Sequence, residues 1–241
     1  MVEEEIMGRA FQVRAASMAS TAAKKSALNM RASKEIYLAA KSGGPDPHSN
    51  LALRAALDKY RALGATKDVM ERAIKKAEGT ELVAYIPGRY EIMGPGGFNI
   101  VVDTLTDNVN RAVSDIKAAI KKGDATFQSV AYKFTETGLF VFDGAKLEEV
   151  EEALILNDVD VWDINEEDDI IEVLVNPMAY GKTRDTLYEL GIKEFNISEI
   201  QMIPNDKITL NEENLILFKR IIDLLEDVQD VQEVYHNVEV A

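Results

Sequence analysis

The residues of this chain that could do chemistry stand in a few short runs, of which SGGPDPHSNLALR at 42–54 is the densest. It combines glycines, prolines, acidic and imidazole groups and an arginine, as a metal or phosphate loop would. A metal would need several convergent ligands, and His48 is one of only two histidines in the chain. A phosphate-binding P-loop would need a preceding strand and a Gly-Lys-Ser/Thr ending, and neither is present.

Each residue of this run has a simpler structural role. Gly43 and Gly44 stop a helix, the two prolines prevent its continuation, and Asp46, Ser49 or Asn50 can cap the next helix. We therefore interpret 42–54 as a corner between two helices.

The other candidate runs also favour structural roles. GPGG at 94–97 is flanked by two strand-like runs, so a hairpin turn is a better interpretation than a phosphate cradle. NEEDD at 165–169 lacks the ligand spacing and central glycine of a calcium loop, which leaves a solvated turn. Tyr235 and His236 have no serine or cysteine partner recognisable in the sequence, so we expect a buried or edge histidine. The acidic pairs at 148–149 and 151–152 solubilise a helix face. We predict no catalytic residue, metal or cofactor, and no enzyme.

The bulk composition predicts a soluble, cytoplasmic, multidomain protein. The chain has 241 residues, 46% of them hydrophobic, with 6 prolines and no cysteine. Such a chain can bury real cores, and the lack of cysteine suits a reducing compartment. The opening MVEEEIMGRAF is acidic where a secretion signal would be basic, and no apolar run approaches membrane-spanning length.

The net charge of −15 hides an asymmetry along the chain. Residues 7–78 hold 14 Lys/Arg against 6 Asp/Glu, or +8, and residues 79–241 hold 13 against 33, or −20. The glutamates at 3–5 restore the total, since 8 − 20 − 3 = −15. One end of the molecule could therefore meet a polyanion that the other end repels.

The basic part reads as helical, because residues 9–78 are rich in Ala, Leu, Lys and Arg. In 24–41, Lys24, Arg31, Lys34 and Lys41 occupy a sector separate from the apolar side. Two further amphipathic helices follow the corner, and the last starts near Thr66 and ends at Gly79. The pattern predicts a basic helical domain with cationic outer faces.

From residue 82 strand-sized runs alternate with helices. We expect a hairpin around GPGG, a second hairpin around Thr137 and Gly138, strands around NEEDD, and a closing strand–helix–strand that completes the first sheet. This order predicts an α+β multidomain fold: a three-helix domain followed by two α+β sandwich domains of ferredoxin-like type, one inserted in the other. The expected boundaries are 7–79, 82–127 plus 194–241, and an insert at 128–193.

Several runs resemble one known family. GGPDPHSNLALRAALDKYRALGATKDVMERAIKKAEG, YEIMGPGGFNIVVDTLTDNVNR, SVAYKF and IIDLLEDVQDVQEVYHN are similar to the YebC/PmpR family, which includes the mitochondrial translational activator of cytochrome c oxidase. The likeness runs from about Met7 to Asn237, and TDNVNRAV looks closest to the YeeN-type branch. It implies a three-domain molecule. Family members are described as DNA-binding transcriptional regulators, and some as translation factors acting at the ribosome.

We accordingly expect a non-enzymatic, DNA-binding transcriptional regulator, with the basic helices on phosphates. A ribosome-associated translation factor on rRNA or tRNA and a protein-interaction scaffold remain alternatives, and the acidic domains could recruit a basic protein. No membrane or small-molecule substrate is expected. The predicted phosphate-contacting residues are Arg9, Arg14, Lys24, Lys25, Arg31, Lys34, Arg54, Arg61, Arg72, Lys75 and Lys76.

Overall fold

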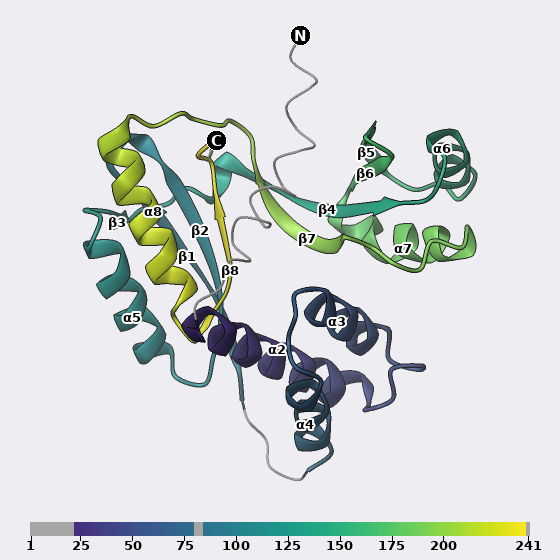
Figure 1. The fold of residues 1–241 in the computed structure, drawn as a ribbon, viewed down its shortest axis with the longest axis horizontal. Coiled ribbons are helices and arrows are strands. Elements are labelled where there is room, and N and C mark those ends of the chain that lie inside the picture. Colours follow the sequence, from purple (N-terminus) through teal and green to yellow (C-terminus); the bar gives the residue numbers. More distant parts are fainter. Residues whose placement is uncertain (1–21, 80–83, 240–241) are drawn as a thin grey trace. The chain divides into compact units, whose positions relative to one another are not determined.

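The computed structural model describes residues 22–79 and 84–239, with the side chains of 22–24 left undescribed. The chain divides into two compact units (Figure 1). The larger unit comprises 19–134 and 204–241, and the inserted unit includes 135–203. No helix among the described residues is long and apolar enough to cross a membrane.

Three helices open the larger unit: α2 (Ala22–Gly43), α3 (Leu51–Ala62) and α4 (Lys67–Glu78). Their apolar stripes meet in one core, in which Ile36, Leu53 and Tyr60 are almost fully buried. The predicted basic helical part is therefore a packed three-helix bundle in this structure.

The corner between α2 and α3 has the predicted form. Gly44 has a φ of 92°, a left-handed conformation that glycine adopts without strain. The Asn50 side chain caps α3, because its Oδ1 accepts the Leu53 N–H at 3.0 Å. Its Nδ2 donates to the carbonyls of Ala39 and Gly44, which ties the end of α2 to the start of α3.

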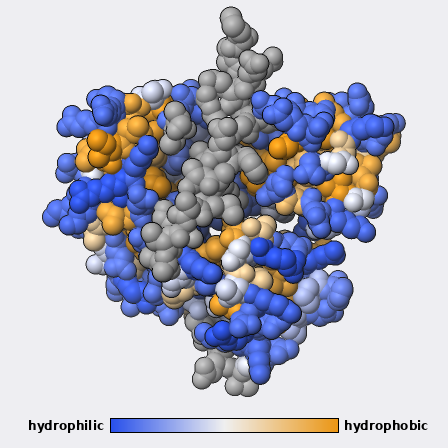
Figure 2. Space-filling view, viewed as in Figure 1, coloured by the Kyte–Doolittle hydropathy of each residue, from blue (hydrophilic) through white to orange (hydrophobic). Residues whose placement is uncertain are grey.

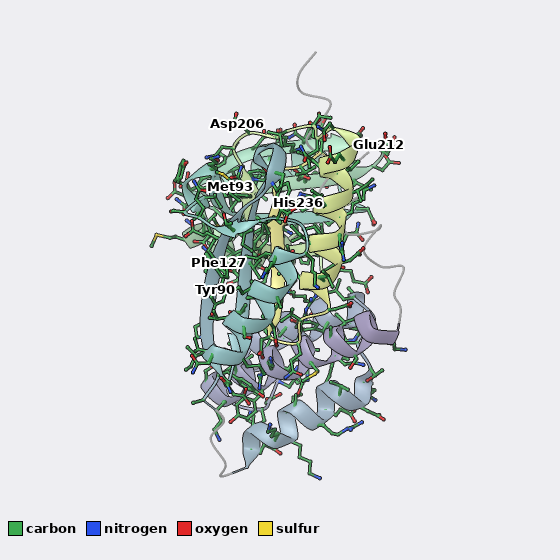
Figure 3. The ribbon with its side chains drawn as sticks, turned by 90° about the vertical axis from the view of Figure 1, so that its left-hand side faces the viewer. Tyr90, Met93, Phe127, Asp206, Glu212 and His236 are labelled. Carbon is green, nitrogen blue, oxygen red and sulfur yellow. The ribbon has the colours of Figure 1, made fainter. Side chains whose placement is uncertain are left out.

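The first sheet of the larger unit contains β1 (Ile86–Met93), β2 (Asn99–Thr106), β3 (Thr126–Phe127) and β8 (Val231–His236), in the order β3-β1-β2-β8. All three pairings are antiparallel. The helices α5 (Val109–Lys121) and α8 (Glu212–Glu226) contribute to one core with the sheet and lie side by side along it (Figures 1 and 3). GPGG forms the hairpin turn between β1 and β2, as predicted, with the short helix η2 (Pro95–Gly97) at its tip.

The inserted unit has the order β4 (Phe134–Asp143), α6 (Leu147–Leu156), β5 (Val161–Glu167), β6 (Ile170–Val175), α7 (Tyr180–Glu189) and β7 (Ile197–Pro204). Its sheet order is β5-β6-β4-β7. This βαββαβ arrangement is ferredoxin-like, and both helices pack on one core with Phe140 and Phe142. The predicted α+β fold class, with an N-terminal helical part and two sheet-containing parts, is confirmed.

The strand β7 lies in the second sheet, whereas we expected it to complete the first. It adds to β4, which would otherwise leave an open edge of unpaired backbone groups. Of the two strands in the predicted strand–helix–strand ending, only β8 joins the first sheet, and α8 packs on it. The inserted unit accordingly spans 135–203 instead of the expected 128–193.

The hairpin predicted around Thr137 and Gly138 is wrong, because both residues lie inside the continuous strand β4. A Cβ on Gly138 would approach the Val175 Cγ2 atom to 2.7 Å and the Tyr180 ring to 3.3 Å. The glycine is therefore needed for close packing against β6 and α7. In the sequence alone, such a glycine cannot be distinguished from one that marks a turn.

The two connections to the inserted unit leave the larger unit together. The backbone N–H of Asn205 donates to the Lys133 carbonyl at 2.9 Å, immediately outside the two ends of the insert. Lys133 closes the short helix η3 (Ala131–Lys133). A backbone hydrogen bond thus joins the two connections at the base of the insert.

Candidate nucleic-acid interface

The eleven predicted phosphate-contacting residues fall into three groups. Arg9 and Arg14 lie outside the described residues, as does the side chain of Lys24. Arg31 and Lys34 of α2 are used in contacts within the larger unit. The remaining six are exposed, and they are Lys25, Arg54, Arg61, Arg72, Lys75 and Lys76.

Lys34 is buried, with only 6% of its side chain exposed. Its Nζ lies 2.6 Å from Oδ1 of Asp230 and donates to the carbonyls of Leu105 and Gln229 at 2.9 and 3.0 Å. An ammonium has three donors, and all three are occupied here. Lys34 is therefore not available to a phosphate, which corrects its place in the predicted set.

Asp230, whose side chain is fully buried, is held by two cations from different helices. Arg111 of α5 makes a bidentate contact, with Nε on Oδ2 and Nη2 on Oδ1, both at 2.9 Å. Burial alone would raise the pKa of Asp230, but the hydrogen bonds from Arg111 and Lys34 outweigh it and lower that pKa below its usual value. The Lys34–Asp230–Arg111 cluster joins α2 to the first sheet.

Arg31 and Lys41 also face inward, onto helix ends. The Arg31 guanidinium donates to the carbonyl of Glu226, the last residue of α8, at 2.8 Å and to the Val231 carbonyl at 2.7 Å. Lys41 donates to the carbonyls of Ala77 and Gly79 at the end of α4. The carbonyls of Glu226 and Ala77 belong to the last turns of α8 and α4, where carbonyls lack helical partners and the negative end of the helix dipole favours a cation. The α2 stripe is thus an internal seam where we expected a cationic outer face.

Lys59 and Tyr60 of α3 make a second attachment to the first sheet. The Lys59 Nζ lies 3.0 Å from Glu233 of β8 and 3.5 Å from Glu35 of α2. The Tyr60 hydroxyl donates to Glu35 at 2.6 Å, and burial raises the pKa of this hydroxyl well above its usual value. The helical bundle is therefore fixed to the sheet at two places.

The other cations of α3 and α4 remain at the surface. Arg54 and Arg61 are seven residues apart on α3, and Arg72, Lys75 and Lys76 share one face of α4 by their spacing. Arg61 pairs with Asp58 at 2.7 Å, an exposed contact of the kind that contributes little and that a phosphate can replace. We call these five residues the α3–α4 cation set.

Sequence reasoning missed one exposed cation of this region. Lys67 begins α4 and keeps 83% of its side chain exposed, beside Glu71 at 3.5 Å. The signal in the sequence was its position directly after Thr66, near which the helix was expected to start, because the first residue of a helix is commonly exposed. Thr66 does occupy the cap position, although its side chain makes no capping hydrogen bond.

The other candidate residues have structural surroundings. His236 in the edge strand β8 contacts the Phe218 ring edge-on, with ring centroids 4.9 Å apart, and burial lowers the pKa of its imidazole to about 4. NEEDD closes the β5–β6 hairpin, and Asp168 and Asp169 both have positive φ. Within 22–79 and 84–239 no three His, Cys, Asp or Glu side chains cluster as metal ligands would.

The inserted unit is strongly acidic. Residues 135–203 contain 18 Asp/Glu against 4 Lys/Arg, a net charge of −14. Nearly all of the chain's net charge of −15 therefore belongs to this unit. A polyanion is repelled by it at distances up to about 10 Å at moderate salt.

Comparison with known proteins connects this architecture to one family. Residues 9–80 match the family model of the TACO1/YebC protein N-terminal domain, and 85–238 match that of the TACO1/YebC second and third domain. A "probable transcriptional regulatory protein", Mfl546 of Mesoplasma florum, is 48% identical over 96% of this chain and 99% of its own length. Another, from Mycoplasma capricolum, is 47% identical over 97% of this chain and all of its own.

A solved structure shares the fold as well. The conserved hypothetical protein Aq1575 of Aquifex aeolicus superposes with a TM-score of 0.73 at 26% identity, covering 92% of this chain and 93% of that one. The matched regions span the helical bundle and both sheets. The chain therefore belongs to the TACO1/YebC family.

Proposed function

We propose that this protein is a non-enzymatic, cytoplasmic regulator of gene expression that binds nucleic acid, with DNA as the first candidate. The observation that carries the proposal is the exposure of the α3–α4 cation set on a packed bundle. Arg31 and Lys34 of α2, in contrast, are used in hydrogen bonds within the larger unit. The relatives named as probable transcriptional regulatory proteins support a regulatory role.

The contact would be made through phosphates. Arginine and lysine side chains on helix faces neutralise backbone charge and fix the orientation of the protein, without reading bases. Lys25 and Lys67, which are also exposed, would extend the surface. Each phosphate contact releases condensed counterions, so the affinity falls steeply with salt.

The acidic inserted unit would keep nucleic acid on the helical bundle. Its charge of −14 disfavours wrapping of a polyanion and favours contact with a basic protein partner. We propose such a partner as the second contact of a regulator that joins nucleic acid to protein.

The test is a fourfold charge reversal, R54E/R61E/K75E/K76E. Its control is K146E/K182E/K193E in the inserted unit, which reverses three exposed cations outside the bundle and changes the net charge by −6 against −8. Binding to a 20-base-pair DNA duplex and to a 20-nucleotide RNA is measured by fluorescence anisotropy between 50 and 200 mM salt. We expect the bundle variant to lose at least about a hundredfold in affinity and most of its salt dependence, with the control unchanged.

Two results would contradict the proposal. If the bundle variant binds both probes as tightly as the wild type, the four substituted residues do not contact phosphates. A wild-type protein without measurable affinity for either probe favours the protein-interaction scaffold. Sedimentation with ribosomes, compared with promoter-fragment binding at the same salt, then separates a translation factor from a DNA-binding regulator, because the same cations fit phosphates of DNA, rRNA and tRNA.

A further inference from the structure

The two helices on the first sheet approach each other closely at one end. Gly123 follows α5, and a Cβ built on it would lie 2.5 Å from Cδ1 of Ile221 and 2.9 Å from the Leu217 carbonyl of α8. A glycine is therefore required where α5 ends against α8. Figure 3 shows these helices side by side on the same side of the sheet.

A shallow cleft of about 470 Å³ opens beside this contact, mainly along α8. Ile216 is 62% exposed there, and Figure 2 shows hydrophobic side chains among hydrophilic ones over α8. The cleft is lined by Lys122, Ile216, Lys219, Arg220, Asp223 and Leu224. It thus combines an apolar floor with three cations and one carboxylate.

Exposed cations gather at this place. After residue 78, the larger unit comprises 79–134 and 204–241, which have a net charge of −6, since −20 − (−14) = −6. Five of the nine Lys/Arg in these two segments are exposed on or directly after α5 and on α8. They are Lys117, Lys121, Lys122, Lys219 and Arg220. The negative end of the α5 dipole explains cations at 121–122. It does not explain Lys219 and Arg220, which stand in the middle of α8.

We propose that this cleft binds an acidic, amphipathic segment of a partner protein. An aliphatic or aromatic side chain of the segment would rest between Ile216 and Leu224, and its carboxylates would pair with Lys122, Lys219 and Arg220. Helical segments recognised in grooves use this combination of an apolar anchor and flanking charges. The site is separate from the α3–α4 cation set and does not depend on nucleic-acid binding.

A nucleic acid suits the cleft less well. Phosphates need no apolar floor, and the six described residues that line the cleft include no aromatic ring on which a base could stack. Asp223 in the lining also interrupts a continuous track of positive charge. These features favour carboxylates on a partly apolar ligand.

The experiment selects ligands on the full-length protein. A phage-displayed library of 12-residue peptides is panned on the wild type, and the enriched peptides are synthesised with a fluorescent label. We expect several Asp or Glu residues together with Leu, Ile or Phe at spacings of three or four. Anisotropy should show about tenfold or greater weakening for K219E/R220E and for Ile216→Ser.

The matched control is K117E/K121E, which changes the net charge equally on the neighbouring helix but leaves the cleft lining intact. It should keep at least half of the affinity, and circular dichroism checks that all variants are folded. Enriched peptides without acidic excess, no enrichment, or equal weakening by both charge pairs would each overturn the proposal. Selective loss of binding to a 20-base-pair DNA duplex in K219E/R220E would overturn it in favour of a phosphate site. The R54E/R61E/K75E/K76E test of the proposed function is independent of that outcome.

Discussion

Helix α2 and the pair α3–α4 carry the same cationic residue types at the same helical spacings, but they use them differently. On α2, Arg31 and Lys34 donate to backbone carbonyls of the first sheet and of the end of α8, and Lys34 also pairs with buried Asp230. On α3 and α4, Arg61 and Lys75 stay at the surface. Spacing alone therefore groups cations by face, whereas the packing of other elements decides which face meets solvent.

The difference has an energetic side. A buried ammonium is tolerated only because a carboxylate and two carbonyls replace its water, so each partner depends on the others. An exposed cation keeps its water and can exchange one anionic partner for another at little cost. The first arrangement fixes a structure, and the second leaves charge available for binding.

The strongest test of this contrast is Lys34→Ala. It leaves Asp230 buried with one cation fewer and two carbonyls without their donor, so we expect the free energy of unfolding to fall by about 3–5 kcal/mol. The control Lys25→Ala, on the same helix but exposed, should change it by less than about 0.5 kcal/mol. Urea denaturation followed by circular dichroism measures both, and equal midpoints would remove the distinction between the two kinds of cation.

A second test asks what happens to a buried base without an acidic partner. The pKa of His236 is lowered by burial to about 4, below its unfolded value near 6.5, so the unfolded chain binds the extra proton first. The contribution of neutral His236 to the free energy of unfolding is complete above pH 6.5 and is lost as the pH falls toward 4. With about 1.4 kcal/mol per pH unit over 2.5 units, the loss is at most about 3.5 kcal/mol.

Urea midpoints between pH 7 and pH 4 measure this loss, and His236→Gln should flatten the curve in that window. The pKa of Asp230 is lowered instead, so its contribution is present above about pH 4 and is lost only below it. A wild-type curve that is level from pH 6.5 to 4 would contradict the neutral, buried state of His236.

A smaller effect is expected at the corner where the two kinds of helix meet. Asn50→Ala removes the cap of α3 and both hydrogen bonds to the end of α2, with an expected loss of about 1–2 kcal/mol. Asn50→Ser serves as the matched control, because its hydroxyl oxygen can accept the capping bond while the two bonds donated to Ala39 and Gly44 are lost. If the two variants are equally stable, the capping bond contributes nothing at this site.

The smallest effect on stability per substituted residue is expected for R54E/R61E/K75E/K76E. Each substitution lies at the surface, where the free energy of unfolding changes by no more than about 0.5 kcal/mol. Part of this change arises from new repulsion with acidic neighbours on the same helices. Thermal unfolding should therefore shift by only a few degrees while nucleic-acid affinity falls. A variant that unfolds as readily as Lys34→Ala would show that these cations are structural after all.

Much of the fold was predictable from local signals. The corner at 42–54, the GPGG turn and the bounds of α4 near Thr66 and Gly79 each follow from residues within a few positions of one another. The position of β7 was not, because pairing with β4 is decided by which sheet edge is open across more than fifty residues of chain. Gly138 misled for a related reason, since its cause is the approach of Val175 from another strand.

The candidate site was predictable in part. The amphipathic pattern of α3 and α4 leaves Arg54 and Lys75 opposite the core, so their exposure follows from the sequence. The burial of Lys34 does not follow, because its partners Leu105 and Asp230 come from distant strands and loops. An acidic residue destined for the interior cannot be told from a solvated one by composition.

The hydrogen bond between Asn205 and Lys133 holds the two connections to the inserted unit next to each other, so the insert could be removed at a single place. Since the chain leaves and re-enters the larger unit at this bond, we expect that the 69 residues between Phe134 and Pro204 can be replaced by a short glycine-containing bridge. The shortened chain would carry a net charge of −1, since −15 − (−14) = −1. It would show, in a single binding curve, how far the acidic module restrains the basic helices.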